Sequence, residues 1–187
     1  MIRQRAIPST IPTLSFCAYA SNSGKTTLLT QLIPALIARG LRVSVIKHAH
    51  HTFDIDYPGK DSYKLREAGA VQTMIASNTR WALMTEHRNM LDTATEPSLN
   101  TLLTQLDTSL TDVILVEGFR HEAIPKIEVF RASLGQPLLA MQDSTIIAIA
   151  SDSQLASNLP SQLPVLDLNN IEQIADFVTK FASRSRL

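Results

Sequence analysis

Hydrophobic and polar positions alternate along the chain with two different periods. Apolar runs of strand length occupy residues 13–18, 42–47, 113–116, 126–130 and 145–150. Segments whose apolar residues recur at helical spacing are found at residues 25–39, 61–68, 98–106 and 171–181. Strands that alternate with helices are typical of an α/β fold with a mostly parallel sheet. The sequence therefore predicts a twisted, mostly parallel sheet with helices on both faces.

The first predicted helix, residues 25–39, has the clearest pattern. Its apolar residues share one helical face, and they are Leu28, Leu29, Leu32, Ile33, Leu36 and Ile37. Gly40 follows, where a helix commonly ends. Pro34 lies inside the segment, and a proline there removes one backbone hydrogen bond and bends the helix. The apolar face passes Pro34 without a change of phase, so one helix is predicted.

Two further strand segments, residues 71–77 and 80–86, are separated only by Asn78 and Thr79. Two residues are enough for a tight turn, so we expect a hairpin that projects from the main sheet. Linker-like composition is not found between the predicted elements. We therefore expect a flexible lead-in at residues 1–12 and a single nucleotide-binding domain over residues 13–187.

Composition narrows the class of protein. Hydrophobic residues make up 44% of the 187 residues and charged residues 18%, which is typical of a folded soluble chain. Lys plus Arg equals Asp plus Glu, at 17 each, so net charge gives no reason to expect a nucleic-acid or membrane partner. Apolar runs are all shorter than a membrane span. A lone cysteine, Cys17, excludes a disulfide framework and is expected in the core. A cytoplasmic location is expected.

The strongest motif is Gly24, Lys25, Thr26 and Thr27, between the first predicted strand and the first predicted helix. It matches the second half of the P-loop pattern G-x-x-x-x-G-K-[ST]. Backbone N–H groups of the loop and of the helix N-terminus would face nucleotide phosphates. We expect Lys25 to reach the β- and γ-phosphates, Thr26 to bind Mg²⁺ and Thr27 to face the α-phosphate. The alternative is a capped helix start with an ordinary surface lysine.

The first half of this pattern is irregular, because Tyr19 stands where the first glycine belongs. Ser21, Asn22 and Ser23 complete the predicted nucleotide-binding loop. Asn22 is expected to adopt a left-handed backbone, which asparagine tolerates better than most residues. The irregularity concerns the shape of the loop and its affinity more than the presence of the site.

A carboxylate follows the apolar strand at residues 113–116. Glu117 ends that strand and Gly118 permits a tight turn after it. Ligands of α/β proteins bind at the carboxyl ends of the strands, so Glu117 is predicted to hold Mg²⁺ together with Thr26. The alternative is a surface glutamate at a strand end.

A polar segment rich in histidine and aspartate follows the strand at residues 42–47. His48, His50 and His51 come first, and Asp54 and Asp61 follow. One interpretation is a switch-like segment over the triphosphate, in which Asp54 or Asp61 orients the water shell of the metal and the histidines meet phosphate or substrate. Together with Glu117 these aspartates are the candidate catalytic residues. The other interpretations are a transition-metal site and ordinary loop chemistry.

Several short strings occur in order along the chain. They are SNSGKTTL at residues 21–28, KHAHH at 47–51, GKDSY at 59–63, REAGA at 66–70 and VEGF at 116–119. Together they resemble the molybdopterin-guanine dinucleotide biosynthesis adaptor family (MobB type). The similarity covers nearly all of residues 13–182, and the combination is far more specific than any one motif.

This resemblance implies a three-layer P-loop NTPase-type fold and a homodimer. It implies GTP and Mg²⁺ as ligands, with slow hydrolysis. The role implied is that of an adaptor that assists the guanylyltransferase joining GMP to molybdopterin, by delivering GTP or by binding the molybdopterin-type cofactor. Because the chain has no glutamine placed to orient attacking water, at most a slow Mg²⁺-dependent GTPase is expected.

Asp152 is the candidate for guanine recognition. It follows the apolar strand at residues 145–150, as an aspartate does in related GTP-binding folds. A carboxylate can accept both the N1–H and the N2–H₂ of guanine, a donor pair that adenine lacks. The Asn-Lys-x-Asp signature of many GTPases is absent. The alternative is an aspartate that caps a helix or turn.

Arg120, just after the turn at Gly118, could contact a phosphate of the nucleotide or of the pterin, or could be a solvated loop charge. Two other functions share the motifs. A small-molecule kinase needs an acceptor pocket and a lid, and a lid segment is not evident in the sequence. A metallochaperone GTPase would use His48, His50 and His51 as metal ligands.

Overall fold

The computed structural model describes residues 11–49, 53–87, 98–155, 159 and 163–184. By their internal contacts the residues group into two compact units, and each unit is described separately. The first unit contains Met1–His48 and Ser98–Leu187, and the second contains Ala49–Pro97. A single domain over residues 13–187 stays a prediction, and residues 1–10 of the expected lead-in lie outside the described part.

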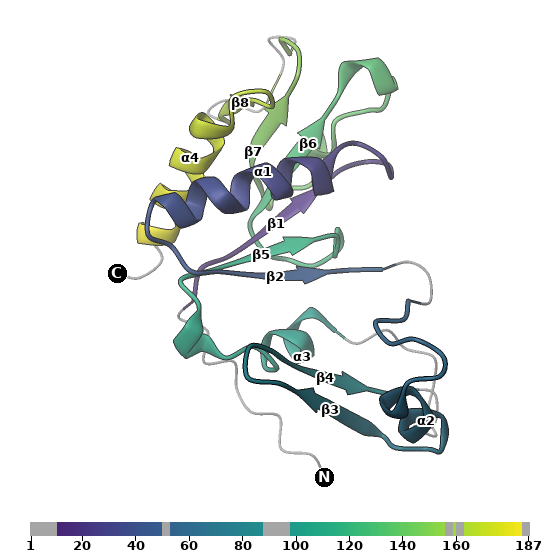
Figure 1. The fold of residues 1–187 in the computed structure, drawn as a ribbon. Coiled ribbons are helices and arrows are strands. Elements are labelled where there is room, and N and C mark those ends of the chain that lie inside the picture. The colour runs from purple at the N-terminus through teal and green to yellow at the C-terminus, as the bar shows by residue number, and fades with distance from the viewer. Residues whose placement is uncertain (1–10, 50–52, 88–97, 156–158, 160–162, 185–187) are drawn as a thin grey trace. The chain divides into compact units, whose positions relative to one another are not determined.

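The first unit is built on a six-stranded sheet in which every pair of neighbours is parallel (Figure 1). Across the sheet the strands follow the order β2-β5-β1-β6-β7-β8. Their bounds are β1 Thr13–Cys17, β2 Val43–Lys47, β5 Val113–Glu117, β6 Lys126–Phe130, β7 Ile146–Ser151 and β8 Val165–Asp167. The predicted parallel sheet is confirmed. Parallel strands bring all their carboxyl ends to one edge of the sheet.

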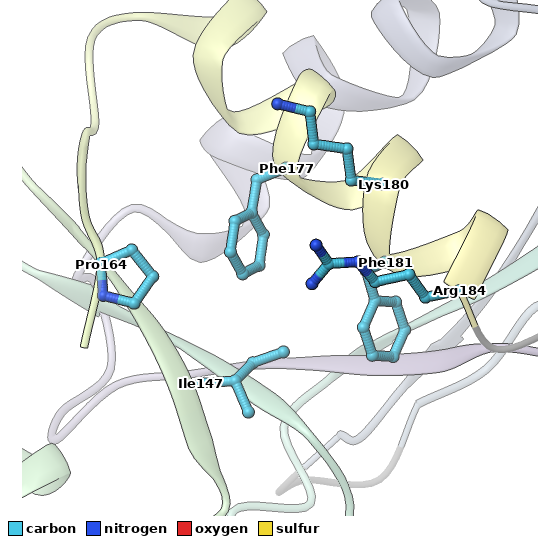
Figure 2. A pocket seen from close by; sticks show the side chains of 6 residues that line it. All are labelled: Ile147, Pro164, Phe177, Lys180, Phe181 and Arg184. Atoms are coloured by element: carbon cyan, nitrogen blue, oxygen red, sulfur yellow. The ribbon is translucent and has the colours of Figure 1, made fainter. Parts of the chain in front are cut away.

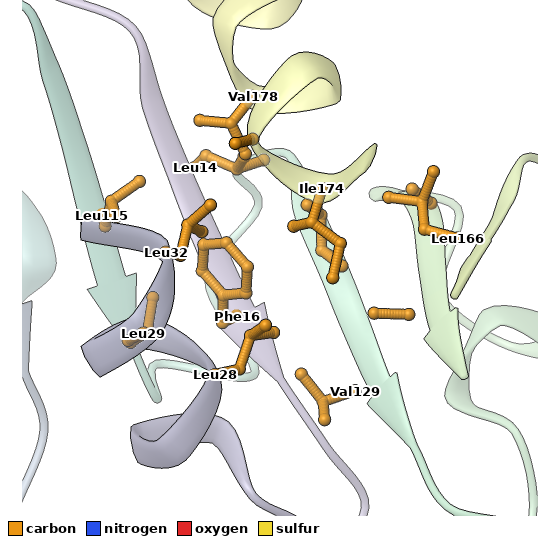
Figure 3. Close-up of a cluster of buried hydrophobic side chains, with 14 of the residues drawn as sticks. Leu14, Phe16, Leu28, Leu29, Leu32, Leu115, Val129, Leu166, Ile174 and Val178 are labelled. Carbon is orange, nitrogen blue, oxygen red and sulfur yellow. The ribbon is translucent and has the colours of Figure 1, made fainter. Parts of the chain in front are cut away.

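Two long helices cover one face of this sheet, α1 (Lys25–Ala38) and α4 (Ile171–Arg184). Figure 3 shows the cluster between them and the strands, with Phe16 of β1 facing Leu32 of α1 and Ile174 of α4. The opposite face carries the short helix α3 (Leu99–Leu103), which packs on Ile46, Ile114 and Val116. Helices therefore lie on both faces of the sheet, as predicted.

Helix α1 is anchored by leucines. Those buried against the sheet are Leu28, Leu29, Leu32 and Leu36. Each fully buried side chain of this size contributes roughly 1.5–3 kcal/mol, so the start of the helix at Lys25 is firmly placed. Pro34 lies inside the single helix, as expected. Ile37, expected on the buried face, is 58% exposed although its neighbour Leu36 is fully buried, so Ile37 lies outside the face that packs on the sheet.

The face of the central strands that carries α3 also holds polar side chains. Glu128 of β6 accepts hydrogen bonds from the backbone N–H groups of Leu139 and Ala140, and burial raises its pKa. Lys126 donates to Asp143 and Thr145. Cys17 is buried as predicted, and burial raises the pKa of its thiol to about 12. The two charged groups, Glu128 and Lys126, are thus paired with the segments that follow β6.

The structure differs from the sequence-based expectations in short elements. Strand β8 was not predicted, since three residues show no period. Helix α3 is shorter than the predicted span 98–106, because the chain leaves the helix after Leu103 and forms the short 3₁₀ turn η1 (Thr108–Leu110). Two more 3₁₀ turns, η2 (Ala132–Leu134) and η3 (Leu139–Met141), follow β6. None of the described helices has the length and apolar content needed to cross a membrane.

The second unit contains helix α2 (Asp61–Glu67) and an antiparallel hairpin of β3 (Gln72–Ala76) and β4 (Trp81–Thr85). The backbone N–H of Ser77 donates to the carbonyl of Arg80 at 2.7 Å, which closes the predicted two-residue turn. Arg66 of α2 is buried and binds Asp54 through two hydrogen bonds of 2.8 and 2.6 Å. That pair ties the segment before α2 to the helix.

Candidate nucleotide-binding site

The loop between β1 and α1 has the backbone that its sequence predicts. Asn22 has a φ of 63° and Gly24 a φ of 90°, so both lie in the left-handed region. The expectation for Asn22 is confirmed. Ser23 is buried, and its hydroxyl donates to the carbonyl of Ala20 at 2.7 Å. The loop is therefore held by internal hydrogen bonds and needs no glycine at Tyr19.

The first turn of α1 is open to an anion. Gly24 stands at the N-cap position and has no side chain to occupy the first backbone N–H groups. Lys25, Thr26 and Thr27 follow without an acidic residue. The Lys25 ammonium lies back over the loop and donates to the carbonyl of Ala20 at 3.3 Å. A capped helix start is thus ruled out, and the positive end of the helix dipole and an ammonium converge here.

A second group of side chains meets beside this turn. The hydroxyl of Thr26 donates to Glu117 Oε1 at 2.7 Å, across 91 positions of sequence. Lys47 Nζ lies 3.3 Å from Glu117 Oε2 and 3.3 Å from Thr26 Oγ1. Glu117 is only 12% exposed at its side chain, so it is not an ordinary surface glutamate.

This arrangement fits a hard divalent cation. A hydroxyl oxygen and a carboxylate oxygen are the ligands that Mg²⁺ takes in P-loop proteins. The ammonium of Lys47 lies 3.3 Å from Thr26 Oγ1 and 3.3 Å from Glu117 Oε2, so a positive charge already stands beside this hydrogen-bonded pair. The predicted partnership of Thr26 and Glu117 is therefore geometrically sound.

Strand register explains why these side chains meet. Lys47 of β2 pairs with Glu117 of β5, and Glu117 pairs with Phe16 of β1. All three are at the carboxyl ends of adjacent strands. Lys47 was missed by the sequence analysis, which treated residue 47 as the end of a strand. Its charge at the end of an apolar strand, like that of Glu117, was the signal that could have found it.

Asp152 lies just beyond β7, at the same edge of the sheet. Its carboxylate accepts from Arg131 NH1 at 3.0 Å and from the backbone N–H of Ala132 at 3.3 Å. Arg131 also donates through Nε to the carbonyl of Ser23 in the loop, at 3.2 Å. The alternative of a helix cap is not supported, because the described residues after Asp152 begin no helix. Arg131 was missed by the sequence analysis.

His48 packs against the turn that follows Glu117. Its backbone N–H donates to the carbonyl of Glu117, and its ring lies 4.8 Å from the ring of Phe119. Gly118 has a φ of 97°, and a Cβ there would lie 2.7 Å from the Cβ of His48. A glycine is therefore required at this turn. The expected contact of His48 with phosphate or substrate stays a prediction.

The remaining loop candidates each have a local partner. Arg120 donates to the carbonyl of Tyr19 at 3.3 Å and lies over its ring, so it contacts the start of the loop. Asp54 and Asp61 belong to the second unit. The hydrogen bonds from Arg66 lower the pKa of Asp54 to about 2, and Asp61 pairs with Lys64 at 3.1 Å.

The described residues do not provide a set of ligands for the transition-metal site that was considered for the histidine-rich loop. His50 and His51 lie outside the described part of the chain. Within the described ranges, groups of three or more His, Cys, Asp or Glu that could hold a metal are not found. The part of the loop that would carry this function therefore stays a sequence-based hypothesis.

An apolar hollow of about 410 Å³ lies elsewhere in the first unit. Figure 2 shows its lining side chains, which are Ile147, Pro164, Phe177, Lys180, Phe181 and Arg184. They stand at the start of β7, before β8 and on the last turns of α4. That is the amino-terminal edge of the parallel sheet, opposite the loop at Gly24. The hollow therefore cannot serve as the acceptor pocket of a kinase at this site.

Comparison with known proteins places the chain. The family model described as "Molybdopterin guanine dinucleotide synthesis protein B", MobB, matches residues 13–152. The chain belongs to the MobB family. Among MobB relatives, the molybdopterin-guanine dinucleotide biosynthesis adapter protein of Escherichia coli (strain K12) is 51% identical, over 93% of this chain and 95% of that protein. The Haemophilus influenzae adapter protein is 47% identical, over 90% and 88%.

Solved MobB structures share the fold. A crystal structure of molybdopterin-guanine biosynthesis protein B is 26% identical, with a TM-score of 0.67, and covers 91% of this chain and 99% of that one. The MobB homologue from Bacillus stearothermophilus is 22% identical with a TM-score of 0.65, over 92% and 98%. The predicted MobB resemblance and the P-loop NTPase-type α/β fold are thereby confirmed.

Proposed function

We propose that this protein is a GTP-binding adaptor in molybdopterin guanine dinucleotide biosynthesis. The observation that carries the proposal is the convergence of the open first turn of α1, the Lys25 ammonium and the Thr26–Glu117 pair at one edge of the sheet. Its Escherichia coli and Haemophilus influenzae relatives are named as adapter proteins of this biosynthesis. The site supplies the nucleotide chemistry that such an adaptor would need.

Phosphate binding is assigned to the loop and the first turn of α1. Ser21, Asn22, Ser23 and Gly24 shape the cradle, and its backbone N–H groups face the phosphates. The hydrogen bond from Lys25 to the carbonyl of Ala20 is long, at 3.3 Å. Lys25 gives it up and reaches the β- and γ-phosphates. Thr27, which is exposed at the start of the helix, faces the α-phosphate. An ammonium and a helix N-terminus act together on the same anion.

Thr26 and Glu117 are the residues that would hold Mg²⁺. When bound, the ion neutralises charge on the phosphates. The hydroxyl of Thr26 would turn its lone pair to the metal and give up its hydrogen bond to Glu117. Lys47 would move away from the pair, beside which its ammonium now stands.

Asp152 is assigned to the guanine base. β7 carries it to the same edge as the phosphate loop, two strands away from β1 in the sheet. Its carboxylate has lone pairs left to accept the N1–H and N2–H₂ of guanine, since two oxygens offer about four acceptor positions. This arrangement favours guanine over adenine.

Hydrolysis is assigned a minor part, at most a slow Mg²⁺-dependent GTPase. Asp54 and Asp61 are the switch-region candidates that orient water near the metal, and His48, His50 and His51 line the same segment of sequence. Arg120, which contacts the start of the loop, is a candidate for a phosphate of the nucleotide or of the pterin. Rapid phosphate release by the isolated protein would contradict this assignment.

The partners proposed are the molybdenum cofactor guanylyltransferase, a molybdopterin-type cofactor and a second copy of this chain, in the cytoplasm. The hairpin offers a surface for the second copy. Met74, Trp81 and Leu83 share one face of it and are 61%, 61% and 39% exposed. A two-stranded hairpin is only marginally stable by itself in water, so an apolar cover on this face is favourable.

The adaptor role is tested with the guanylyltransferase and nucleotide together. We expect this protein to bind the guanylyltransferase in a pull-down, and to raise the yield of guanylated cofactor in a reconstituted reaction. The Lys25→Ala variant should lose the gain in yield because its phosphate binding fails. If neither binding nor yield changes with the wild-type protein, the adaptor function is wrong.

A further inference from the structure

Arg131 occupies a central place at the carboxyl edge of the sheet. It follows β6, which lies between β1, whose end leads into the phosphate loop, and β7, whose end leads to Asp152. Phe130 pairs with Ser151 in the register of β6 and β7. The residues one position further on, Arg131 and Asp152, therefore start side by side.

The guanidinium of Arg131 binds two partners at once. Nε donates to the carbonyl of Ser23 at 3.2 Å, and NH1 donates to Asp152 Oδ2 at 3.0 Å. A planar guanidinium holds its donors in a fixed fork. The spacing between the phosphate loop and the Asp152 carboxylate is therefore set by one rigid group.

Gly24 makes room for this group. A Cβ on Gly24 would lie 3.2 Å from NH2 and 3.3 Å from Nε of Arg131. The guanidinium thus rests directly on the loop backbone at the start of α1. Asp152 is meanwhile held from its other side by the N–H of Ala132, at 3.3 Å. Both contacts fix the direction of the carboxylate.

We propose that Arg131 is the positioning residue for guanine selectivity, fixing the Asp152 carboxylate at the distance from the phosphate loop that a guanine nucleotide requires. The inference rests on the proposed role of Asp152. Phosphates and base are the two ends of one ligand, so a carboxylate at the wrong distance cannot accept from guanine while the phosphates are bound. A guanidinium only donates, so Arg131 occupies none of the loop N–H groups that would face the phosphates, and we expect phosphate binding to persist without it.

The test compares affinities for GTP and for ITP, whose base lacks the N2-amino group. Both are measured by calorimetry with Mg²⁺, for the wild type, Arg131→Gln, Arg131→Lys and Asp152→Ala. We expect the wild type to bind GTP more tightly than ITP. In Arg131→Gln the ratio of the two affinities should fall about tenfold, because the misplaced Asp152 carboxylate loses its hydrogen bond to the guanine amino group. ITP keeps the N1–H but lacks the N2-amino group, so it should lose less affinity than GTP. Arg131→Lys keeps the charge without the fork, and should lose the preference too.

A merely structural role for Arg131 predicts a different result, namely equal losses for GTP and ITP with a lower melting temperature. Arg42→Gln is the matched control. It removes another arginine–aspartate pair, with Asp112 at 2.9 Å, at the opposite edge of the sheet, and should leave the preference unchanged.

The outcomes separate the two proposals. If the wild type does not distinguish GTP from ITP, or Asp152→Ala keeps the preference, the assignment of the base to Asp152 fails. If Asp152→Ala loses the preference while Arg131→Gln or Arg131→Lys keeps it, the role of Arg131 is overturned and that of Asp152 stands.

Discussion

At the scale of single residues, the site is a set of charges that are already engaged with one another. Lys25 contacts a loop carbonyl, Lys47 contacts Thr26 and Glu117, and Arg131 contacts Asp152. In the proposed complex, Lys25 and Lys47 exchange these internal partners for the phosphates and the metal. Arg131 keeps its contact with Asp152.

Lys47 gives the sharpest prediction at this scale. In Lys47→Met the ammonium beside Thr26 and Glu117 is gone, so a divalent cation no longer competes with it. We expect Mn²⁺, measured by electron paramagnetic resonance without nucleotide, to bind up to about fivefold more tightly, because a half-exposed ion pair contributes ~0–1 kcal/mol. Lys64→Met, which removes the exposed pair with Asp61, serves as the control. Weaker Mn²⁺ binding by Lys47→Met would show that Lys47 is not the stand-in for a metal.

The site residues that the sequence predicts are those marked by a short local motif. Gly24, Lys25 and Thr26 form a contiguous motif, and Glu117 ends an apolar strand. Lys47 also ends an apolar strand, but its place beside Thr26 and Glu117 does not follow from that, and Arg131 has no motif at all. Their roles arise because β5 is inserted between β1 and β2 and because β6 lies between β1 and β7. Strand order is a property of the tertiary fold, and the spacing of residues along the chain does not specify it.

At the scale of elements, helix α1 connects the core to the site. Its buried leucines pack on the sheet while its first turn carries Lys25, Thr26 and Thr27. The period of apolar residues predicted this helix nearly to its ends. Strand β8 and the end of α3 were not predicted, since elements of three to five residues have too few positions to show a period.

Replacing Pro34 tests how much stability α1 loses by lacking one backbone hydrogen bond. Pro34 is exposed inside the helix, and Pro34→Ala restores an N–H donor to the carbonyl four residues earlier. We expect the free energy of unfolding, from denaturant titration followed by circular dichroism, to rise by about 1–3 kcal/mol. Gln31→Ala, an exposed change in the same helix, should alter it by less than ~0.5 kcal/mol. A fall in stability for Pro34→Ala would mean that the bend at Pro34 is needed for packing.

At the scale of the whole molecule, the chain is a P-loop unit with a smaller helix-and-hairpin unit inserted between β2 and α3. This insertion explains why the predicted alternation of strands and helices is interrupted by two strand segments joined through a two-residue turn. The inserted unit carries the largest group of exposed apolar side chains on paired strands, with Met74 directly opposite Leu83. Exposed apolar faces of this kind commonly mark interaction sites.

Oligomeric state tests that face. In Leu83→Lys a charge is placed in the centre of the apolar face, and we expect the dimer to dissociate to monomers in gel filtration with light scattering. Thr79→Lys adds the same charge at the hairpin turn, away from the face, and should leave the dimer intact. A monomeric wild type, or a Leu83→Lys variant that stays dimeric, would show that the second copy does not bind there.

The central claim is that the loop before α1 and Lys25 bind the phosphates of GTP. Calorimetric titration of GTP with Mg²⁺ into the wild type and Lys25→Ala tests it most directly. We predict binding at one GTP per chain for the wild type and an affinity about a hundredfold lower for Lys25→Ala, since a charge-assisted contact with the β- and γ-phosphates contributes up to ~3 kcal/mol. Equal affinity of the two proteins for GTP, or no binding by the wild type, would contradict it.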